Sequence, residues 1–132
     1  MFDPGLNIGE VIDNRRLMDI FHCACEGGVR YSKKTGTVVL IVNNANPGLP
    51  NEQDGRVLRF AGRPFKEADV YAGANKRLKE FLDAGKPVFL FVADKPGRYA
   101  FRGPATYAGE PTVASSPEGV SYPVFHLLLP EA

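Results

Sequence analysis

Cysteine and histidine are scarce in this sequence, whose 132 residues hold two of each. Cys23 and Cys25 are separated by a single residue, so they cannot clamp a loop with a disulfide. The two histidines, His22 and His126, lie far apart from each other, and no set of these side chains has the spacing of a metal site. The sequence therefore predicts a reduced, intracellular protein with no metal and no other cofactor.

Long apolar runs are also missing. No stretch approaches the roughly 18 residues that a membrane-spanning helix needs, and the N-terminus lacks the charged and then apolar pattern of a signal peptide. We expect a soluble, cytoplasmic protein without a membrane partner.

The sequence patterns that carry catalysis are absent as well. There is no His-based metal motif, no pair of acids spaced for two metal ions, no nucleophile with an adjacent base and no glycine-rich phosphate loop. These absences favour a binding module over an enzyme.

Net charge is small, at +1 by formal count at pH 7, which alone argues against a nucleic-acid ligand. The charges are segregated, however: residues 28–80 carry ten Lys and Arg against five Asp and Glu, whereas residues 1–26 and 103–132 are acidic. A local basic patch of this size can bind a polyanion on a nearly neutral molecule. The alternative is that these bases only solvate the outside of a barrel.

The length and the hydrophobic content of 44 % fit one globular domain over residues 1–132. Residues 1–26 predict a helical segment, in which Asn14 caps a helix that Gly27 and Gly28 end.

A second, central helix is expected over about residues 70–84, ended by Gly85 and the following Pro87. Either Asp69 or Asn75 can cap its start.

Strands are predicted through much of residues 27–132. The β-branched run Thr37–Val42 is typical of a strand buried on both faces, and the Asn-, Pro- and Gly-rich residues 43–51 after it predict a functional loop. The other expected strands are Val57–Phe60, Pro87–Val92, Arg98–Gly103 continued by Ala105–Gly109, and Val120–Leu129. With no repeated βαβ spacing, this order favours an α+β protein built on a small twisted, mostly antiparallel β-barrel.

Three clusters of turn-forming residues and cations follow one another in the middle of the chain: Gly27–Thr35, Asp54–Gly62 and Asn75–Arg77. Together with Phe21-x-Cys23 and the late Pro96-Gly97-Arg98-Tyr99, this ordered set resembles the SRA-like domain, of PUA-like type, found beside HNH nucleases in modification-dependent restriction enzymes. The match covers nearly the whole chain, although each motif alone is short. The resemblance implies a barrel that recognises 5-methylcytosine or 5-hydroxymethylcytosine in double-stranded DNA by flipping the base into a pocket.

A flipped base needs aromatic walls, because stacking returns on the order of 1–3 kcal/mol of the cost of leaving the duplex. The resemblance places Phe60 as the first aromatic residue of this pocket, with Tyr71 and Tyr31 as candidates for the opposite wall. A phenylalanine on a strand is also a common core residue, which is the alternative for Phe60.

Recognition of the Watson–Crick edge of a cytosine requires a polar side chain. Related domains carry an acid upstream of the second strand, and counting back from Phe60 reaches Asn51, with Glu52 and Asp54 close by. An amide offers both an acceptor and donors, so Asn51 can read the edge of a neutral cytosine. The departure from the expected acid leaves the preferred base open, and an ordinary loop role is the alternative for Asn51.

Contacts to the DNA backbone are expected from hydroxyl and amide groups and from cations, because such groups bind phosphate without reading sequence. The third cluster, Asn75–Arg77, resembles a finger that reaches into DNA in related domains, or it lies at a helix start that binds phosphate. The predicted backbone contacts are Arg30, Ser32, Lys33, Lys34, Arg63, Asn75, Lys76 and Arg77.

Two other functions remain open. A PUA-like hydrolase of a modified nucleoside would use Lys33 or Lys34 with Thr35 and Glu52 in a closed pocket, and a buried lysine would favour it. An RNA-binding module of the same barrel type would depend on the 2′-hydroxyl. An HNH nuclease domain or subunit is the expected partner, and the pattern fits both a stand-alone reader and a piece of a larger nuclease.

Overall fold

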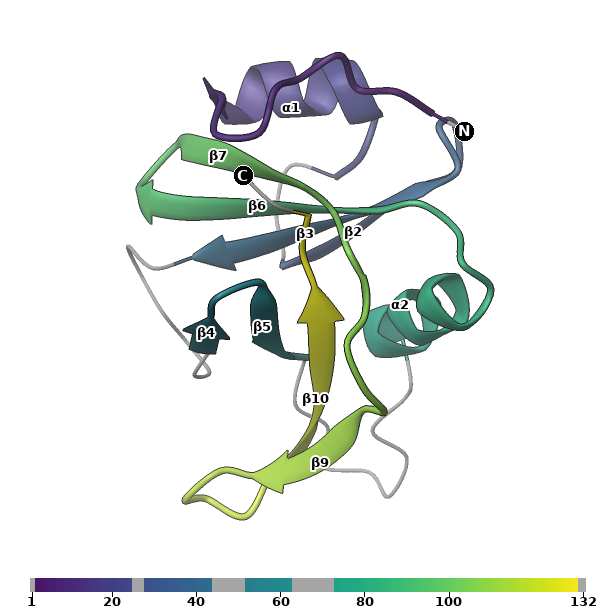
Figure 1. The fold of residues 1–132 in the computed structure, drawn as a ribbon, viewed down its shortest axis with the longest axis vertical. Helices are drawn as coiled ribbons and strands as arrows, with labels where there is room; N and C mark the ends of the chain where they lie inside the picture. Colours follow the sequence, from purple (N-terminus) through teal and green to yellow (C-terminus); the bar gives the residue numbers. More distant parts are fainter. Residues whose placement is uncertain (1, 25–27, 44–51, 63–72, 131–132) are drawn as a thin grey trace.

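The computed structural model describes residues 2–24, 28–43, 52–62 and 73–130, which form two β-sheets and two helices (Figure 1). Sheet A has the strand order β1, β7, β6, β3, β2, and sheet B has the order β4, β5, β10, β8, with β9 also paired to β10. Sheet A comprises β1 (Val11–Ile12), β2 (Val29–Ser32), β3 (Thr37–Asn43), β6 (Val88–Lys95) and β7 (Arg98–Pro104). Sheet B comprises β4 (Glu52–Asp54), β5 (Val57–Ala61), β8 (Thr106–Tyr107), β9 (Thr112–Ser115) and β10 (Ser121–Leu128).

Strand pairing is antiparallel except between β3 and β6, which run parallel in a register from Val38 opposite Val88 to Asn43 opposite Ala93. The pairings among the described residues keep sheets A and B as separate hydrogen-bonded units. The expected α+β class with a mostly antiparallel arrangement is confirmed.

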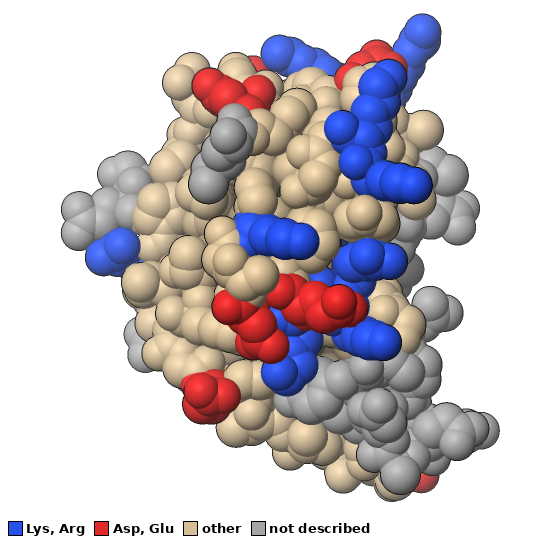
Figure 2. Space-filling view, turned by 90° about the vertical axis from the view of Figure 1, so that its right-hand side faces the viewer, with Lys and Arg blue, Asp and Glu red and all other residues tan. Residues whose placement is uncertain are grey.

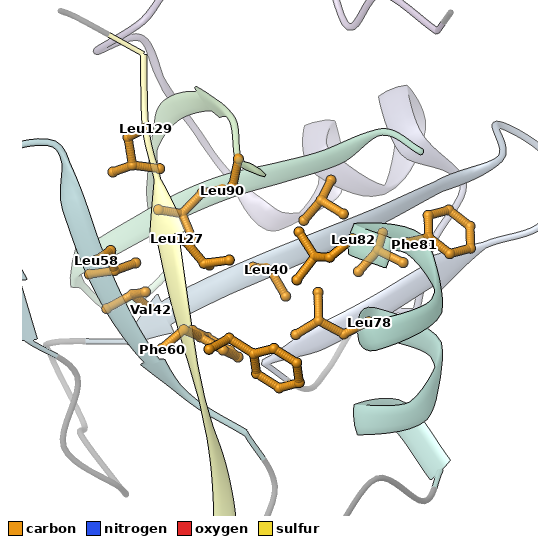
Figure 3. Close-up of a cluster of buried hydrophobic side chains, with 14 of the residues drawn as sticks. Leu40, Val42, Leu58, Phe60, Leu78, Phe81, Leu82, Leu90, Leu127 and Leu129 are labelled. Carbon is orange, nitrogen blue, oxygen red and sulfur yellow. The ribbon is translucent and has the colours of Figure 1, made fainter. Parts of the chain in front are cut away.

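Sheet A is apolar on both faces because alternate side chains of β3 and β6 point to opposite sides. Val38, Leu40 and Val42 face a core that also contains residues of β5, β10 and the second helix (Figure 3). Val39 and Ile41 face a second core under the first helix. The sequence-based prediction of a strand buried on both faces is confirmed.

The first helix, α1 (Asn14–Phe21), begins and ends at residues other than those predicted. Asp13 is its cap, since the Asp13 carboxylate accepts a hydrogen bond of 2.8 Å from the Arg16 backbone N–H. Asn14 is the first helical residue instead. The helix ends because His22 adopts a left-handed conformation with φ 53°, so Gly27 and Gly28 are not its stop.

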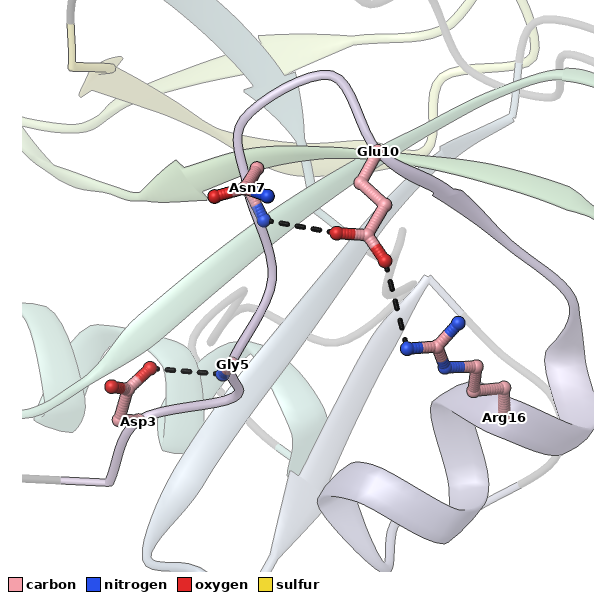
Figure 4. Close-up of polar contacts among 5 residues, drawn as sticks. All are labelled: Asp3, Gly5, Asn7, Glu10 and Arg16. Atoms are coloured by element: carbon pink, nitrogen blue, oxygen red, sulfur yellow. Dashed lines mark hydrogen bonds and ion pairs between the residues drawn. The ribbon is translucent and has the colours of Figure 1, made fainter.

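Polar contacts hold the chain before β1, and one of them reaches α1 (Figure 4). The Glu10 carboxylate accepts a hydrogen bond from the Asn7 N–H at 3.2 Å and pairs with Arg16 at 3.6 Å. The Asp3 carboxylate accepts from the Gly5 N–H at 2.9 Å. This segment was predicted as part of a helical region, but turn-forming residues dominate it.

The second helix, α2 (Gly73–Asp83), ends as predicted. Gly85 has φ 68°, the Gly85 N–H donates to the Leu82 carbonyl, and the Lys86 N–H donates to the Phe81 carbonyl. This is the glycine-terminated cap expected from the sequence. Asn75 lies inside the helix and is not its cap, and Asp69 lies outside the described residues.

Two features of sheet B differ from the prediction. Gly55 and Arg56 form a turn between β4 and β5, where only the second strand was expected. Residues 105–109 do not extend β7; β8 crosses to sheet B and pairs with β10, as does β9. Neither of the two helices in the described ranges is long and apolar enough to cross a bilayer.

Candidate nucleic-acid interface

Strand β2 sends the candidate residues to opposite sides of sheet A. Arg30 and Ser32 are buried, with 4 % and 1 % of their surface exposed, whereas Tyr31 between them is 36 % exposed. Alternation along a strand requires this split, because neighbouring side chains cannot share a face. The three residues therefore cannot serve one binding surface together.

Arg30 ties α1 to β2. Its Nη1 donates to the Asn14 Oδ1 at 2.7 Å and to the Ala24 carbonyl at 3.4 Å, and its guanidinium lies 5.7 Å from the centre of the Tyr99 ring. The prediction that Arg30 contacts DNA phosphate is wrong for this structure, because its guanidinium is buried and bonded within the fold.

Ser32 also has a structural role. Its hydroxyl donates to the His22 carbonyl at 3.3 Å and accepts from the Thr35 N–H at 3.2 Å. These bonds fix the chain after α1 to the turn after β2, and they replace the predicted phosphate contact. The Thr35 hydroxyl donates to the Phe21 carbonyl at 3.2 Å and lies 2.7 Å from the Thr37 hydroxyl.

Cys23 lies half-buried beside Arg30. Burial raises the pKa of the Cys23 thiol, and the nearby Arg30 charge offsets this only in part. The thiol is therefore protonated at neutral pH and is a poor nucleophile.

Tyr31 forms the centre of a stacked group with α2. The Arg77 guanidinium lies over the Tyr31 ring, 4.1 Å from its centre, and the Phe81 ring meets Tyr31 edge-on with centres 5.7 Å apart. On Phe81 lies the Lys86 ammonium, 5.4 Å from the ring centre. We call Arg77, Tyr31, Phe81 and Lys86 the aromatic–cation column.

The column occupies part of the Tyr31 ring. Arg77 lies over one face of the ring and Phe81 contacts its edge, and the role of Tyr31 as a wall of the base pocket stays a prediction. Phe81 and Lys86 were not among the predicted site residues. The sequence does contain a signal for Phe81: it follows Arg77 by four residues, and residues at that spacing lie on the same face of a helix.

Further exposed cations lie on or next to the elements that carry the column. Lys33 and Lys34 lie in the turn between β2 and β3, and Lys76 precedes Arg77 on α2; all three are exposed. The face that carries α2 shows many Lys and Arg side chains around a small group of acids (Figure 2). This surface can attract a polyanion, because many of its bases are solvent-exposed.

One acid on this face is engaged. The Asp83 carboxylate accepts from the Lys79 ammonium at 2.8 Å and from the Tyr107 hydroxyl at 2.7 Å. These hydrogen bonds, that from Lys79 first, lower the pKa of Asp83. They also join the C-terminal turn of α2 to β8 in sheet B.

Phe60 belongs to the core between the sheets. It is 3 % exposed and lies opposite Phe125 in the pairing of β5 with β10 (Figure 3). A Cβ on Gly28 would lie 3.8 Å from its ring, so the ring reaches the start of β2. The described residues place Phe60 in the core, the alternative that its position on a strand already allowed.

Asn75 is fully buried, so the prediction that it contacts DNA phosphate is wrong. It packs against Gly62, at the end of β5, and Pro123 of β10 packs against the same glycine. The next two residues of α2, Lys76 and Arg77, are exposed cations, whereas Asn75 itself holds the helix to sheet B.

Several predicted residues lie outside the described part of the chain. They are Asn51, Arg63 and Tyr71. Glu52 and Asp54 are placed by their backbone only, in β4 opposite Arg59 and Val57.

Comparison with known proteins identifies the fold. No protein-family model and no curated protein sequence matches the chain. Among solved structures, the SRA domain of SUVH5 in complex with hemi-methylated CG DNA matches with a TM-score of 0.74 at 20% identity, over 98% of this chain and 94% of that one.

Two larger proteins contain the same fold. The sulfur-binding and SRA domains of ScoMcrA, complexed with phosphorothioated DNA, match with a TM-score of 0.69 at 11% identity, over 96% of this chain and 40% of that one. SUVH6 of Arabidopsis thaliana, in complex with SAM, matches with a TM-score of 0.67 at 19% identity, over 96% and 27%. This chain therefore has the SRA fold, and it spans less than half the length of these two proteins.

Proposed function

We propose that this chain binds double-stranded DNA that carries a modified cytosine, 5-methylcytosine or 5-hydroxymethylcytosine, and takes the base out of the helix into a pocket. The observation that supports this most is the SRA fold, which the chain shares with domains whose structures were solved on methylated or phosphorothioated DNA. The exposed cations of α2 and of the β2–β3 turn fit the same ligand, since they can displace counterions from phosphates.

The backbone contacts in this proposal are Lys33, Lys34, Lys76 and Arg77, with Arg63 as a further candidate outside the described residues. Such contacts set the position of the protein on DNA and carry no sequence information. Base reading is assigned to Asn51 and Tyr71, on the resemblance of the sequence alone.

The chain acts as a reader and not as the nuclease in this proposal. We propose an HNH nuclease domain or subunit as its partner, in a restriction or defence system located in the cytoplasm. A nucleoside hydrolase fits less well, because Lys33 and Lys34 are exposed and Thr35 is engaged with Phe21 and Thr37. A closed pocket would need a buried base instead.

A binding panel tests the proposal. Duplexes of one sequence that carry cytosine, 5-methylcytosine, 5-hydroxymethylcytosine or N6-methyladenine at one position are titrated with the protein at several salt concentrations. We expect tighter binding to a modified cytosine, with a salt slope that grows by about 0.9 for each phosphate contact. Equal affinity for all four duplexes, or tighter binding to an added RNA duplex of the same sequence, would contradict the proposal.

Three variants extend the panel. Lys76→Ala should weaken modified and unmodified duplexes alike, whereas Lys95→Ala should change neither. Lys95 is exposed at the end of β6, and that end of the strand points away from α2 (Figure 1). Asn51→Ala should remove the preference at a cost of about 1–3 kcal/mol, as for a lost bidentate base contact. A 2-aminopurine beside the modified cytosine should brighten on binding if the base leaves its stack.

A further inference from the structure

The geometry points to Tyr31 as a positioning residue that holds the guanidinium of Arg77 in one orientation for a DNA phosphate. This inference rests on the proposed function. It adds a positioning residue to that function, because Tyr31 acts on DNA binding through Arg77. It also separates Arg77 from the neighbouring lysines, which act as mobile point charges.

Stacking leaves the hydrogen-bonding edge of Arg77 available. A guanidinium donates its N–H groups within its own plane, and a ring that packs on its face uses none of them. With its carbon 4.1 Å above the centre of the Tyr31 ring, Arg77 can present a planar fork to two oxygens of one phosphate.

The Tyr31 ring is itself fixed by two elements. Its backbone is paired to β3, opposite Val38, and its ring meets the edge of Phe81 on α2 at an interplanar angle of 77°. Arg77 lies one helical turn before Phe81, so the helix brings the guanidinium above the ring that Phe81 supports. An exposed arginine without such a support would lose far more side-chain freedom on binding phosphate.

Charge alone does not explain the arrangement. Lys33, Lys34 and Lys76 are exposed as well. Each would contribute to counterion release wherever its side chain points. Arg77 differs because the orientation of its guanidinium is set before DNA binds. A guanidinium must be oriented in this way to donate hydrogen bonds to two phosphate oxygens at once.

The test is a double-mutant cycle on DNA affinity with the full chain and the preferred duplex of the panel. Arg77→Ala should weaken binding ~10-fold, as for one charge-assisted contact, and should lower the salt slope by about 0.9. Tyr31→Leu keeps an apolar contact with Phe81 but removes the π face, and it should weaken binding about two- to fivefold. In the Arg77→Ala background, Tyr31→Leu should have no further effect.

Rescue distinguishes positioning from a merely structural role. Tyr31→Phe and Tyr31→Trp should bind as the wild type does, because both keep a π face. Thermal melting of each variant shows that it is folded at the assay temperature. Lys34→Ala serves as the control, since its effect should add to that of Tyr31→Leu.

The outcomes separate the two hypotheses. Suppose that the wild type prefers modified DNA. The positioning role is overturned if Tyr31→Leu binds as tightly as the wild type, or if it lowers the affinity by the same factor in the presence and in the absence of Arg77. The proposed function stands in both cases. If the wild type shows no preference for a modified duplex, the proposed function fails, and the cycle on unmodified DNA still decides the role of Tyr31. If the wild type binds no DNA at all, both are overturned.

Discussion

The side-chain oxygen of Asn75 occupies space that a side chain on Gly62 would need: a Cβ on Gly62 would lie 2.8 Å from the Asn75 Oδ1 and 2.7 Å from the Pro123 Cγ. Since Asn75 is on α2 and Gly62 follows β5, this contact fixes the cationic helix to sheet B.

Gly62→Ala should therefore destabilise the protein, by about 1–3 kcal/mol, because the buried neighbours cannot move away freely. Urea unfolding measures this change. Gly109→Ala is the matched control, since nothing lies within 4 Å of a Cβ there. Equal stability of the two variants would show that the helix adjusts to the added methyl group.

Arg30 should matter for stability and not for DNA affinity. Asn14→Ala removes the acceptor of a 2.7 Å hydrogen bond from the buried Arg30 guanidinium, which should cost about 1–3 kcal/mol of unfolding free energy. Arg15→Ala, an exposed change on the same helix, should cost little. DNA titrations at a temperature where both variants are folded should match the wild type; a specific loss of affinity in Asn14→Ala would restore the phosphate role of Arg30.

Asp83 should make stability dependent on acid pH. Hydrogen bonds from Lys79 and Tyr107 lower the pKa of Asp83 in the folded protein below its value in the unfolded chain. The stabilisation is thus present above the unfolded pKa and is lost as the pH falls through the folded pKa. Asp83→Asn should flatten the acid limb of stability against pH in urea unfolding.

Phe60 should behave as a core residue. Phe60→Ala should lower the unfolding free energy by about 3–5 kcal/mol, while Phe60→Leu should keep the fold at a smaller cost. Chemical denaturation compares the two. If Phe60→Ala is as stable as the wild type but loses its preference for modified DNA, the ring belongs to the base pocket after all.

The strands were predictable where the hydrophobic pattern of the sequence matches the burial of the strand in the fold. Thr37–Val42 and Pro87–Val92 are apolar throughout because both faces of β3 and β6 are covered, and such runs indicate a strand without knowledge of its partners. The end of α2 was predictable because the residue after the helix adopts a left-handed conformation, which glycine, here Gly85, adopts without strain.

The site was less predictable, because a cluster in sequence is not a cluster in space. Arg30, Tyr31 and Ser32 are adjacent, yet the strand sends the first and third into bonds with α1 and the chain after it. Recognising β2 as a strand would have separated them. The partner of Tyr31, Arg77, comes from a helix far along the chain, and only tertiary packing brings the two together.

The parallel pairing of β3 with β6 means that β4, β5 and α2 all lie within one crossover between two adjacent strands. For a flexible loop, closure entropy grows only with the logarithm of length, at about 0.6 kcal/mol for each doubling. Segments between these elements can therefore lengthen or shorten at little thermodynamic cost while the sheet pairing stays unchanged. Under the proposed function, a change of the recognised base through replacement of such segments should then leave both sheets intact.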